Sequence, residues 1–164
     1  MHPTVPRCGV GFDVHPLVPG RPCIVGGVDI PSDRGLQGHS DADVLTHAVI
    51  DALLGAASMG DIGQHFPDSD VRWKGISSLL MLEAVREQLA EAGWEVVHVD
   101  CIIMAQAPRM APHREAMQHN LAAALRVAAT QINIKATTTE GLGFIGRVEG
   151  VAAQAVATLV GGAR

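Results

Sequence analysis

The chain of 164 residues is 48% hydrophobic, 18% charged and only 3% aromatic, and it contains no tyrosine. This composition predicts a single globular domain over residues 1–164 and excludes disordered and fibrous proteins. The net charge of −5 and the lack of a long basic run predict that nucleic acid is not a partner.

Membrane and secreted classes are also disfavoured by the sequence. No apolar run has the length of a transmembrane helix, and we expect neither a signal peptide nor a membrane partner. Cys8, Cys23 and Cys101 are widely spaced and form neither a disulfide framework nor a zinc-finger spacing. We therefore expect a cytoplasmic protein. Its core is poor in large side chains, which favours an oligomer.

The first predicted element is a strand over residues 7–14, where apolar residues alternate with small or polar ones, and Pro16 is expected to end it. Asp13 and His15 lie two residues apart at its end. Side chains at this spacing point to the same side of an extended chain, so both could reach one metal ion. A strand end that faces solvent explains the same spacing.

A hairpin around paired glycines is predicted over residues 22–30, and residues 31–38 are predicted as a polar loop. Ser40 and Asp43 then have the spacing of a capping box. This spacing predicts a helix from about residue 41 to residues 59–60.

A polar stripe runs along this predicted helix, because Asp43, His47 and Asp51 follow one another at intervals of four. A histidine between two carboxylates on one helical face is typical of a metal site, where the second ring nitrogen needs an acceptor. A solvated face with a surface histidine remains the alternative interpretation.

Residues 60–70 contain two glycines, a proline and three aspartates, which predicts either a long functional loop without regular structure or a flexible surface excursion. Ser77 or Ser78 can cap a second helix over residues 79–92. Residues 94–105 are rich in valine and isoleucine and are predicted as a strand.

After a loop at residues 105–112, the pattern predicts a third helix to about residue 127, a strand over 132–138 and a final strand over 151–160. Residues 137–140 are three threonines and a glutamate, which offer hydroxyl donors beside a metal ligand, although a strand followed by a turn explains them equally well. The order of elements predicts an α+β fold with a single sheet and helices packed on one face, a ferredoxin-like two-layer sandwich.

The chemistry-bearing residues point to a metal centre. Asp13, His15 and His47 would make a two-histidine carboxylate site with an open fourth position, as in catalytic zinc sites. The chain has neither the His-Glu-x-x-His motif of zinc proteases nor a Walker loop. A metal beside hydroxyls and glycine-rich loops favours phosphate chemistry.

Several segments in this order resemble the 2-C-methyl-D-erythritol 2,4-cyclodiphosphate synthase family over residues 9–159. They are GFDVH at 11–15, GHSDAD at 38–43 with His47, GDIG at 60–63 with FPD at 66–68, AQAP at 105–108, and KATTTE at 135–140 with Gly143, Phe144 and Arg147. Two departures are Arg109, where lysine is common, and Ala111, which is smaller than the expected apolar residue.

The resemblance implies that Asp13, His15 and His47 hold one Zn²⁺ per subunit. It implies that Glu140 binds a second divalent cation, Mg²⁺ or Mn²⁺, and that His39 and Thr138 stabilise the transition state. The implied cytidine pocket is formed by Thr137, Thr138 and the loop of Ala105, Gln106, Ala107, Pro108, Arg109, Met110 and Ala111. The implied grip on the methylerythritol phosphate is the loop of Asp61, Ile62, Gly63, Phe66, Pro67, Asp68, Ser69 and Asp70. The other implied substrate contacts are Val14, Ser40, Thr139, Phe144 and Arg147.

The implied reaction is intramolecular. The 2-phosphate of 4-diphosphocytidyl-2-C-methyl-D-erythritol 2-phosphate attacks the β-phosphorus and releases CMP and a cyclic diphosphate, a step of non-mevalonate isoprenoid biosynthesis. The family further implies a homotrimer with active sites between subunits, and a central cavity near Phe144, Arg147 and Glu149 that can hold an isoprenoid diphosphate.

Two other functions fit parts of the same sequence pattern. Another metal-dependent phosphoryl enzyme, such as a phosphodiesterase, would keep the metal site but would need a base to activate water. A non-catalytic trimeric module would bind isoprenoid diphosphates through Arg147 and would not need Asp13.

Overall fold

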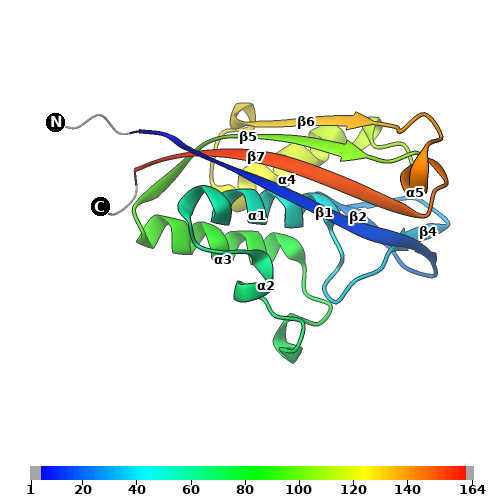
Figure 1. Ribbon diagram of the computed structural model, residues 1–164, viewed down its shortest axis with the longest axis horizontal. Helices are drawn as coiled ribbons and strands as arrows, with labels where there is room; N and C mark the ends of the chain where they lie inside the picture. The colour runs from blue at the N-terminus through cyan, green and yellow to red at the C-terminus, as the bar shows by residue number, and fades with distance from the viewer. Residues whose placement is uncertain (1–4, 162–164) are drawn as a thin grey trace.

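The computed structural model describes residues 5–161 and is built on a five-stranded sheet in the order β4-β1-β7-β5-β6 (Figure 1). All neighbours are antiparallel except β5 and β6, which run parallel. The strands of this sheet are β1 (Arg7–Pro19), β4 (Arg34–Leu36), β5 (Trp94–Met104), β6 (Ile132–Thr137) and β7 (Gly150–Gly161).

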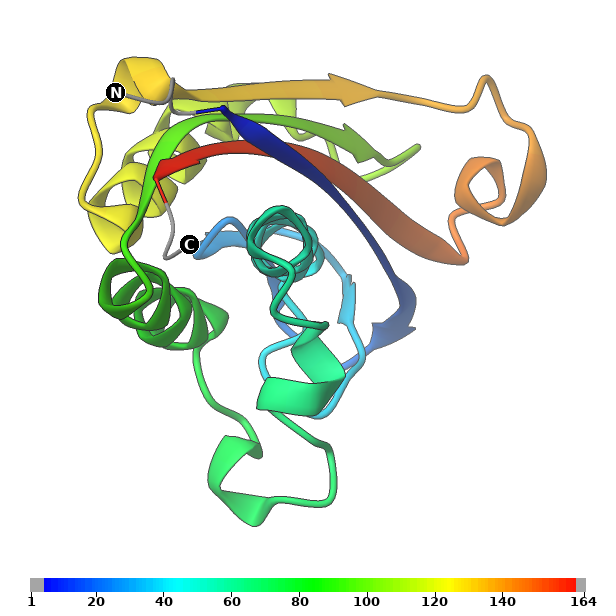
Figure 2. The ribbon, with the colours of Figure 1, turned by 60° about the vertical axis from the view of Figure 1, so that its left-hand side comes forward.

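Three long helices cover one face of this curved sheet (Figure 2). They are α1 (Val44–Ala57), α3 (Ser78–Glu91) and α4 (Arg114–Leu125). Single turns of helix lie in the connections: α2 (Ile62–His65), α5 (Gly143–Gly146), and the 3₁₀ turns η1 (Val71–Trp73), η2 (Ala111–His113) and η3 (Ala129–Gln131). The α+β class and the helices on one face are therefore confirmed.

Helix α1 is buried on nearly every side because it lies between the sheet and α3, so its residues are apolar around most of the helix. On the sheet side, Gly9 and Gly11 of β1 have no side chain to hold the helix away. Among the described residues, no helix is both long and apolar enough to span a membrane.

The predicted hairpin is confirmed as β2 (Cys23–Val25) and β3 (Val28–Ile30). Gly26 and Gly27 occupy its turn at φ values of 56° and 70°, where a residue with a Cβ is disfavoured. These two strands form a separate small sheet, so the prediction of a single sheet was wrong.

The ferredoxin-like detail was also wrong. That motif has the order β-α-β-β-α-β, whereas here the large elements run β1, α1, α3, β5, α4, β6 and β7. Helix α4 connects β5 to β6, and a helical crossover is what makes this neighbouring pair parallel. The final strand β7 then inserts between β1 and β5.

Two boundaries near the site differ from the prediction. Strand β1 continues past Pro16 because the Leu17 amide donates to the carbonyl of Glu149 at 2.9 Å, so the missing proline N–H costs only one bond of the ladder. Helix α1 begins after Asp43 rather than after Ser40, because the Asp43 carboxylate caps it by accepting from the Thr46 amide at 3.0 Å.

Two predicted loops contain short regular elements. Strand β4 lies in the loop predicted at 31–38, where it pairs with the extension of β1 that the prediction lacked. The single turn α2 lies in the loop predicted at 60–70. Asp61 caps this turn by accepting from the Gln64 amide at 3.0 Å.

The sheet face opposite the helices, here called the outer face, carries exposed apolar side chains. Val10, Phe12, Val14 and Val156 are all 41% or more exposed, and they lie on the paired strands β1 and β7. Exposed apolar groups gathered on one face are typical of an interaction surface.

Candidate metal centre

Asp13, His15 and His47 meet where the end of β1 passes the first turn of α1. The Asp13 Oδ2 atom lies 2.8 Å from His15 Nε2 and 3.1 Å from His47 Nδ1, and the two nitrogens are 3.2 Å apart. Three electron-rich atoms this close repel one another unless a proton or a cation lies among them. The predicted ligand set is therefore brought together.

In each histidine, the ring nitrogen that points away from Asp13, here called the outer nitrogen, has an acceptor from another part of the chain. The nitrogen that faces Asp13 is called the inner nitrogen. His15 Nδ1 donates to the Gln37 carbonyl at 2.9 Å, and His47 Nε2 lies 2.8 Å from the Ser78 hydroxyl. With the proton held on the outer nitrogen, the inner nitrogen can present a lone pair to a metal ion. This arrangement fits a divalent metal held by two histidines and a carboxylate.

The electrostatics of the centre favour a charged carboxylate. Burial alone would raise the pKa of Asp13, but hydrogen bonds from His15 and His47, with their charge, lower this pKa to about 2. Burial would likewise lower the pKa of His15, yet the hydrogen bond and charge of Asp13 raise it. The Asp13 carboxylate is therefore ionised at neutral pH and can bind a cation.

The polar stripe predicted along α1 is not the metal site, because only its central histidine is a candidate ligand. The Asp43 carboxylate is fully buried and accepts hydrogen bonds from Gly26 N, Gly27 N, Thr46 N and Thr46 Oγ1 at 2.7–3.0 Å. Asp51 accepts from the Ile62 amide at 2.7 Å. Both flanking carboxylates hold loops against the helix.

A cavity of about 410 Å³, here called the metal cavity, opens beside the three candidate ligands. It brings together ten residues predicted for the site: Asp13, His15, His39, Ser40, His47, Ile62, Gly63, Phe66, Pro67 and Asp68. The predicted functional loop at 60–70 is thus one wall of the metal cavity.

The same cavity contains residues that the sequence analysis missed. Gly38, Trp73 and Met81 also line it. Trp73 packs edge-on against Phe66, with ring centroids 5.0 Å apart. The buried His39 Nε2 and Trp73 Nε1 atoms have no hydrogen-bond partner among the described residues. An aromatic residue soon after a polar loop could have suggested Trp73, but no sequence signal singled out Met81.

A second cavity of about 190 Å³ lies at the ends of β5 and β6. It is lined by Ala136 and by seven residues of the predicted cytidine pocket: Ala105, Gln106, Arg109, Met110, Ala111, Thr137 and Thr138. Ala107 and Pro108, joined by a cis peptide, instead line a neighbouring cavity together with Arg147.

The two cavities are separate within one chain. Four residues are aligned in register across β1, β7, β5 and β6: Val14, Ala152, Met104 and Thr137. Strands β1 and β6 are therefore three strand spacings apart, or about 14 Å. Predicted site residues therefore form two groups, one beside the metal ligands and the other across the sheet.

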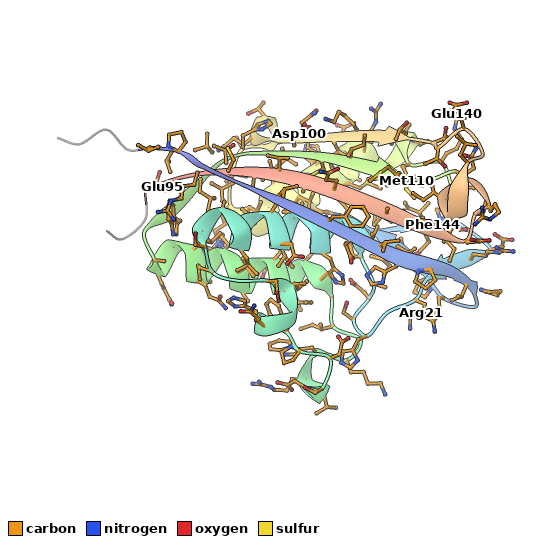
Figure 3. All side chains as sticks on the ribbon, viewed as in Figure 1. Arg21, Glu95, Asp100, Met110, Glu140 and Phe144 are labelled. Carbon is orange, nitrogen blue, oxygen red and sulfur yellow. The ribbon has the colours of Figure 1, made fainter. Side chains whose placement is uncertain are left out.

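The remaining predicted residues lie outside these two cavities. Figure 3 shows Glu140 and Phe144 at the far end of the sheet, beyond β6 and on α5. Val14 is on the outer face, Asp61 caps α2, and Asp70 pairs with Arg72. Ser69 follows the cavity wall, and Thr139 Oγ1 donates to the Leu142 carbonyl at 2.7 Å. Glu140 is exposed and has a φ of 54°.

Comparison with known proteins gives close relatives along nearly the whole chain. The 2-C-methyl-D-erythritol 2,4-cyclodiphosphate synthase of Desulforamulus reducens is 59% identical over 153 residues, which cover 93% of this chain and 98% of that protein. The fold is similar to the bifunctional IspDF of Campylobacter jejuni, with a TM-score of 0.93 and 43% identity over 97% of this chain and 43% of that one.

A second solved structure carries a nucleotide. The IspF of Plasmodium falciparum, in a CDP complex, has a TM-score of 0.84 and 28% identity, covering 96% of this chain and 97% of that one. Residues 6–160 also match the model of the YgbB family. A match of this extent, together with relatives above 50% identity, shows that the chain belongs to the YgbB family.

Proposed function

We propose that this protein is a 2-C-methyl-D-erythritol 2,4-cyclodiphosphate synthase, a phosphorus–oxygen lyase of isoprenoid precursor biosynthesis. In the proposed reaction, the 2-phosphate of 4-diphosphocytidyl-2-C-methyl-D-erythritol 2-phosphate attacks the β-phosphorus. The bond from that phosphorus to the oxygen of CMP breaks, and CMP and the cyclic diphosphate are formed. The names of the relatives support the activity.

One observation carries the proposal more than any other. The two histidines and the carboxylate meet at one point, and that point opens into a cavity walled by the loop predicted to hold the methylerythritol phosphate. Phosphoryl transfer needs positive charge and positioned donors next to the reacting phosphates.

The residues present suit a reaction whose nucleophile is already an anion. Such a nucleophile needs no strong base, so the chain's task is to bring two negative groups together and hold them in line. Asp13, His15 and His47 would hold Zn²⁺, and Glu140 would hold a second cation, Mg²⁺ or Mn²⁺. The two cations would offset the negative charge of the phosphates.

Two further residues are proposed to stabilise the transition state. The buried His39 Nε2 atom, which lacks a partner, is available to a phosphate oxygen in the metal cavity. The Thr138 hydroxyl would act from the cytidine side, with the loop at 105–111 holding the base. Asp61, Ser69 and Asp70 are proposed to support the loop around the methylerythritol phosphate.

The separation of the two cavities supports an active site shared between subunits. We propose a homotrimer in which the metal cavity of one chain faces the cytidine cavity of the next, so that one substrate spans both. The apolar outer face supports the same assembly, because Val10 is 61% and Phe12 is 56% exposed in the single chain.

A central cavity in this trimer is proposed to hold an isoprenoid diphosphate near Phe144, Arg147 and Glu149. Arg147 pairs with Glu149 at 3.0 Å, and Phe144 is 42% exposed beside them on the chain. We also propose that residues 1–164 form one catalytic domain and that the protein is cytoplasmic.

The experiment is to incubate the purified protein with the cytidyl substrate and Mg²⁺ and to follow the products by ³¹P NMR, with and without a zinc chelator. We expect CMP and the cyclic diphosphate, and loss of both on chelation. CMP with a linear bisphosphate would instead identify a hydrolase. No turnover by zinc-loaded trimeric protein would overturn the enzymatic proposal.

A further inference from the structure

The residue behind His47 is Ser78, the first residue of α3. Its side chain is fully buried, and its hydroxyl lies 2.8 Å from His47 Nε2. The same hydroxyl contacts the Asp41 carboxylate, which also accepts from the Ser78 amide at 3.0 Å. Asp41, Ser78 and His47 therefore form a continuous hydrogen-bonded chain that ends at the metal centre.

The direction of the hydrogen bonds in this chain follows from what each group can donate. A carboxylate has no proton to give, so the Ser78 hydroxyl donates its single proton to Asp41. The Ser78 oxygen then faces His47 Nε2 only as an acceptor. Its lone pair thus holds a proton on Nε2, the nitrogen that points away from the metal centre.

This direction decides which nitrogen of His47 can bind a metal. A neutral imidazole carries one proton, and with that proton on Nε2 the Nδ1 atom is a bare ligand. Nδ1 is the atom that lies 3.1 Å from Asp13 Oδ2 and 3.2 Å from His15 Nε2. The Asp13 carboxylate alone would instead attract a proton to Nδ1.

Ser40 is the other hydroxyl near His47. Its oxygen lies 3.1 Å from Nε2 and accepts from the Ala42 amide at 3.3 Å. It contacts no carboxylate, and its other hydroxyl neighbour is the Ser78 oxygen at 3.5 Å. Ser40 is therefore a weaker second acceptor.

Asp41 is itself held in place by the backbone. Its amide donates to the Ile76 carbonyl at 3.1 Å, and its Oδ1 atom accepts from the Asp43 amide at 3.1 Å. The loop before α1 and the loop before α3 are therefore joined at this carboxylate, which fixes the position of Ser78 relative to His47.

We propose that Asp41 and Ser78 are positioning residues that hold His47 in its metal-binding tautomer and so set the affinity of the centre for Zn²⁺. The inference rests on the metal site of the proposed function but not on the reaction. Outer partners of this kind change metal affinity by about tenfold to a hundredfold when they are removed.

The test measures the Zn²⁺ dissociation constant of the full-length protein by competition with a chromophoric chelator. We expect Ser78→Ala to weaken binding by about tenfold to a hundredfold. Ser77→Ala is the matched control, because the neighbouring Ser77 side chain makes no capping hydrogen bond. Asp41→Ala should weaken binding at least as much, since it removes the acceptor that fixes the direction of the Ser78 hydroxyl.

A second readout separates positioning from general damage to the fold. In the zinc-loaded protein, ¹⁵N NMR should show the His47 proton on Nε2 in slow exchange with water, and Ser78→Ala should speed that exchange. Equal zinc affinity in wild type and Ser78→Ala would overturn the proposal. So would equal losses in Ser77→Ala and Ser78→Ala that follow the loss of thermal stability.

These outcomes stay distinct from those of the ³¹P experiment. Weakened zinc binding in Ser78→Ala would stand even if the wild-type protein proved to be a hydrolase. Failure of the wild type to bind Zn²⁺ at all would overturn both the metal centre and this inference.

Discussion

Gly11 and Ala48 bring strand β1 and helix α1 into backbone contact, because a Cβ on Gly11 would overlap the carbonyl oxygen of Ala48. Asp13 follows Gly11 by two residues on β1, and His47 precedes Ala48 on α1. The close approach of these two backbones therefore sets the distance between two of the three candidate metal ligands.

Gly11→Ala should consequently damage both stability and the metal centre. The added methyl meets backbone atoms, which cannot rotate away, so the helix must move. We expect the free energy of unfolding to fall by about 2 kcal/mol or more, as for other overpacked cores. Urea denaturation and zinc competition would measure the two effects.

Gly55→Ala is the control within the same interface. Gly55 lies inside α1, and its added Cβ would stand 3.8 Å from the Val10 carbonyl oxygen, its nearest neighbour beyond the helix backbone, which is an ordinary contact. Alanine is favoured over glycine in a helix interior by up to about 1 kcal/mol. We expect a small gain in stability with unchanged zinc affinity. A loss as large as that of Gly11→Ala would contradict this account.

Asp43→Ala should be among the more destabilising substitutions in the chain. The buried carboxylate satisfies the amides of Gly26 and Gly27 and both donors of Thr46, and alanine leaves all of them unpaired. Each unpaired buried group costs about 1–3 kcal/mol, so we expect a loss of about 3 kcal/mol or more in urea denaturation. Asp33→Ala, at an exposed position, should change stability by less than about 0.5 kcal/mol.

Much of the fold and of the site could be predicted from local sequence. The alternation in β1 placed Asp13 and His15 on one side, and the paired glycines located the β2–β3 turn. The polar stripe along α1 singled out His47, and the family resemblance supplied most residues of both cavities. These features depend on spacing within one segment or on short motifs that carry the family resemblance.

The parts that were wrong depend on contacts between distant segments. Ser40 is of a residue type that commonly caps helices, but its hydroxyl faces His47. Asp43 instead caps α1 and holds the β2–β3 hairpin. The pairing of β4 with β1 depends on a strand that continues past Pro16. Ser78 also has the sequence of a cap, and only the approach of α3 to α1 reveals its contact with His47.

Phe12→Asp should disrupt the proposed trimer. Phe12 is 56% exposed at the centre of the apolar stripe on the outer face, and a charge there would be buried without a partner in the assembly. We expect light scattering after size-exclusion chromatography to show a shift toward monomer, with synthase activity lost in parallel.

Val71→Asp is the matched control for the assembly. Val71 is 77% exposed but lies on η1, away from the sheet. This variant should keep the oligomeric state of the wild type. If Phe12→Asp and wild type elute with the same mass, the outer face is not the subunit interface.

Asp51→Asn should stabilise the metal-free protein at neutral pH. Burial raises the pKa of Asp51, and the charges of Asp61 and Asp13 add to this, although the Ile62 amide opposes it. Because the folded pKa exceeds the unfolded value of 3.8, ionisation costs stability as pH rises through 3.8, and this cost is absent at lower pH. Asparagine avoids this cost and keeps an oxygen for the Ile62 amide.

Urea denaturation at fixed protein concentration should therefore show the variant more stable than wild type at about pH 7, with the difference shrinking toward about pH 3.5. Asp51→Ala, which loses the acceptor for Ile62, should show no such gain, and an asparagine variant less stable than wild type at neutral pH would refute the explanation.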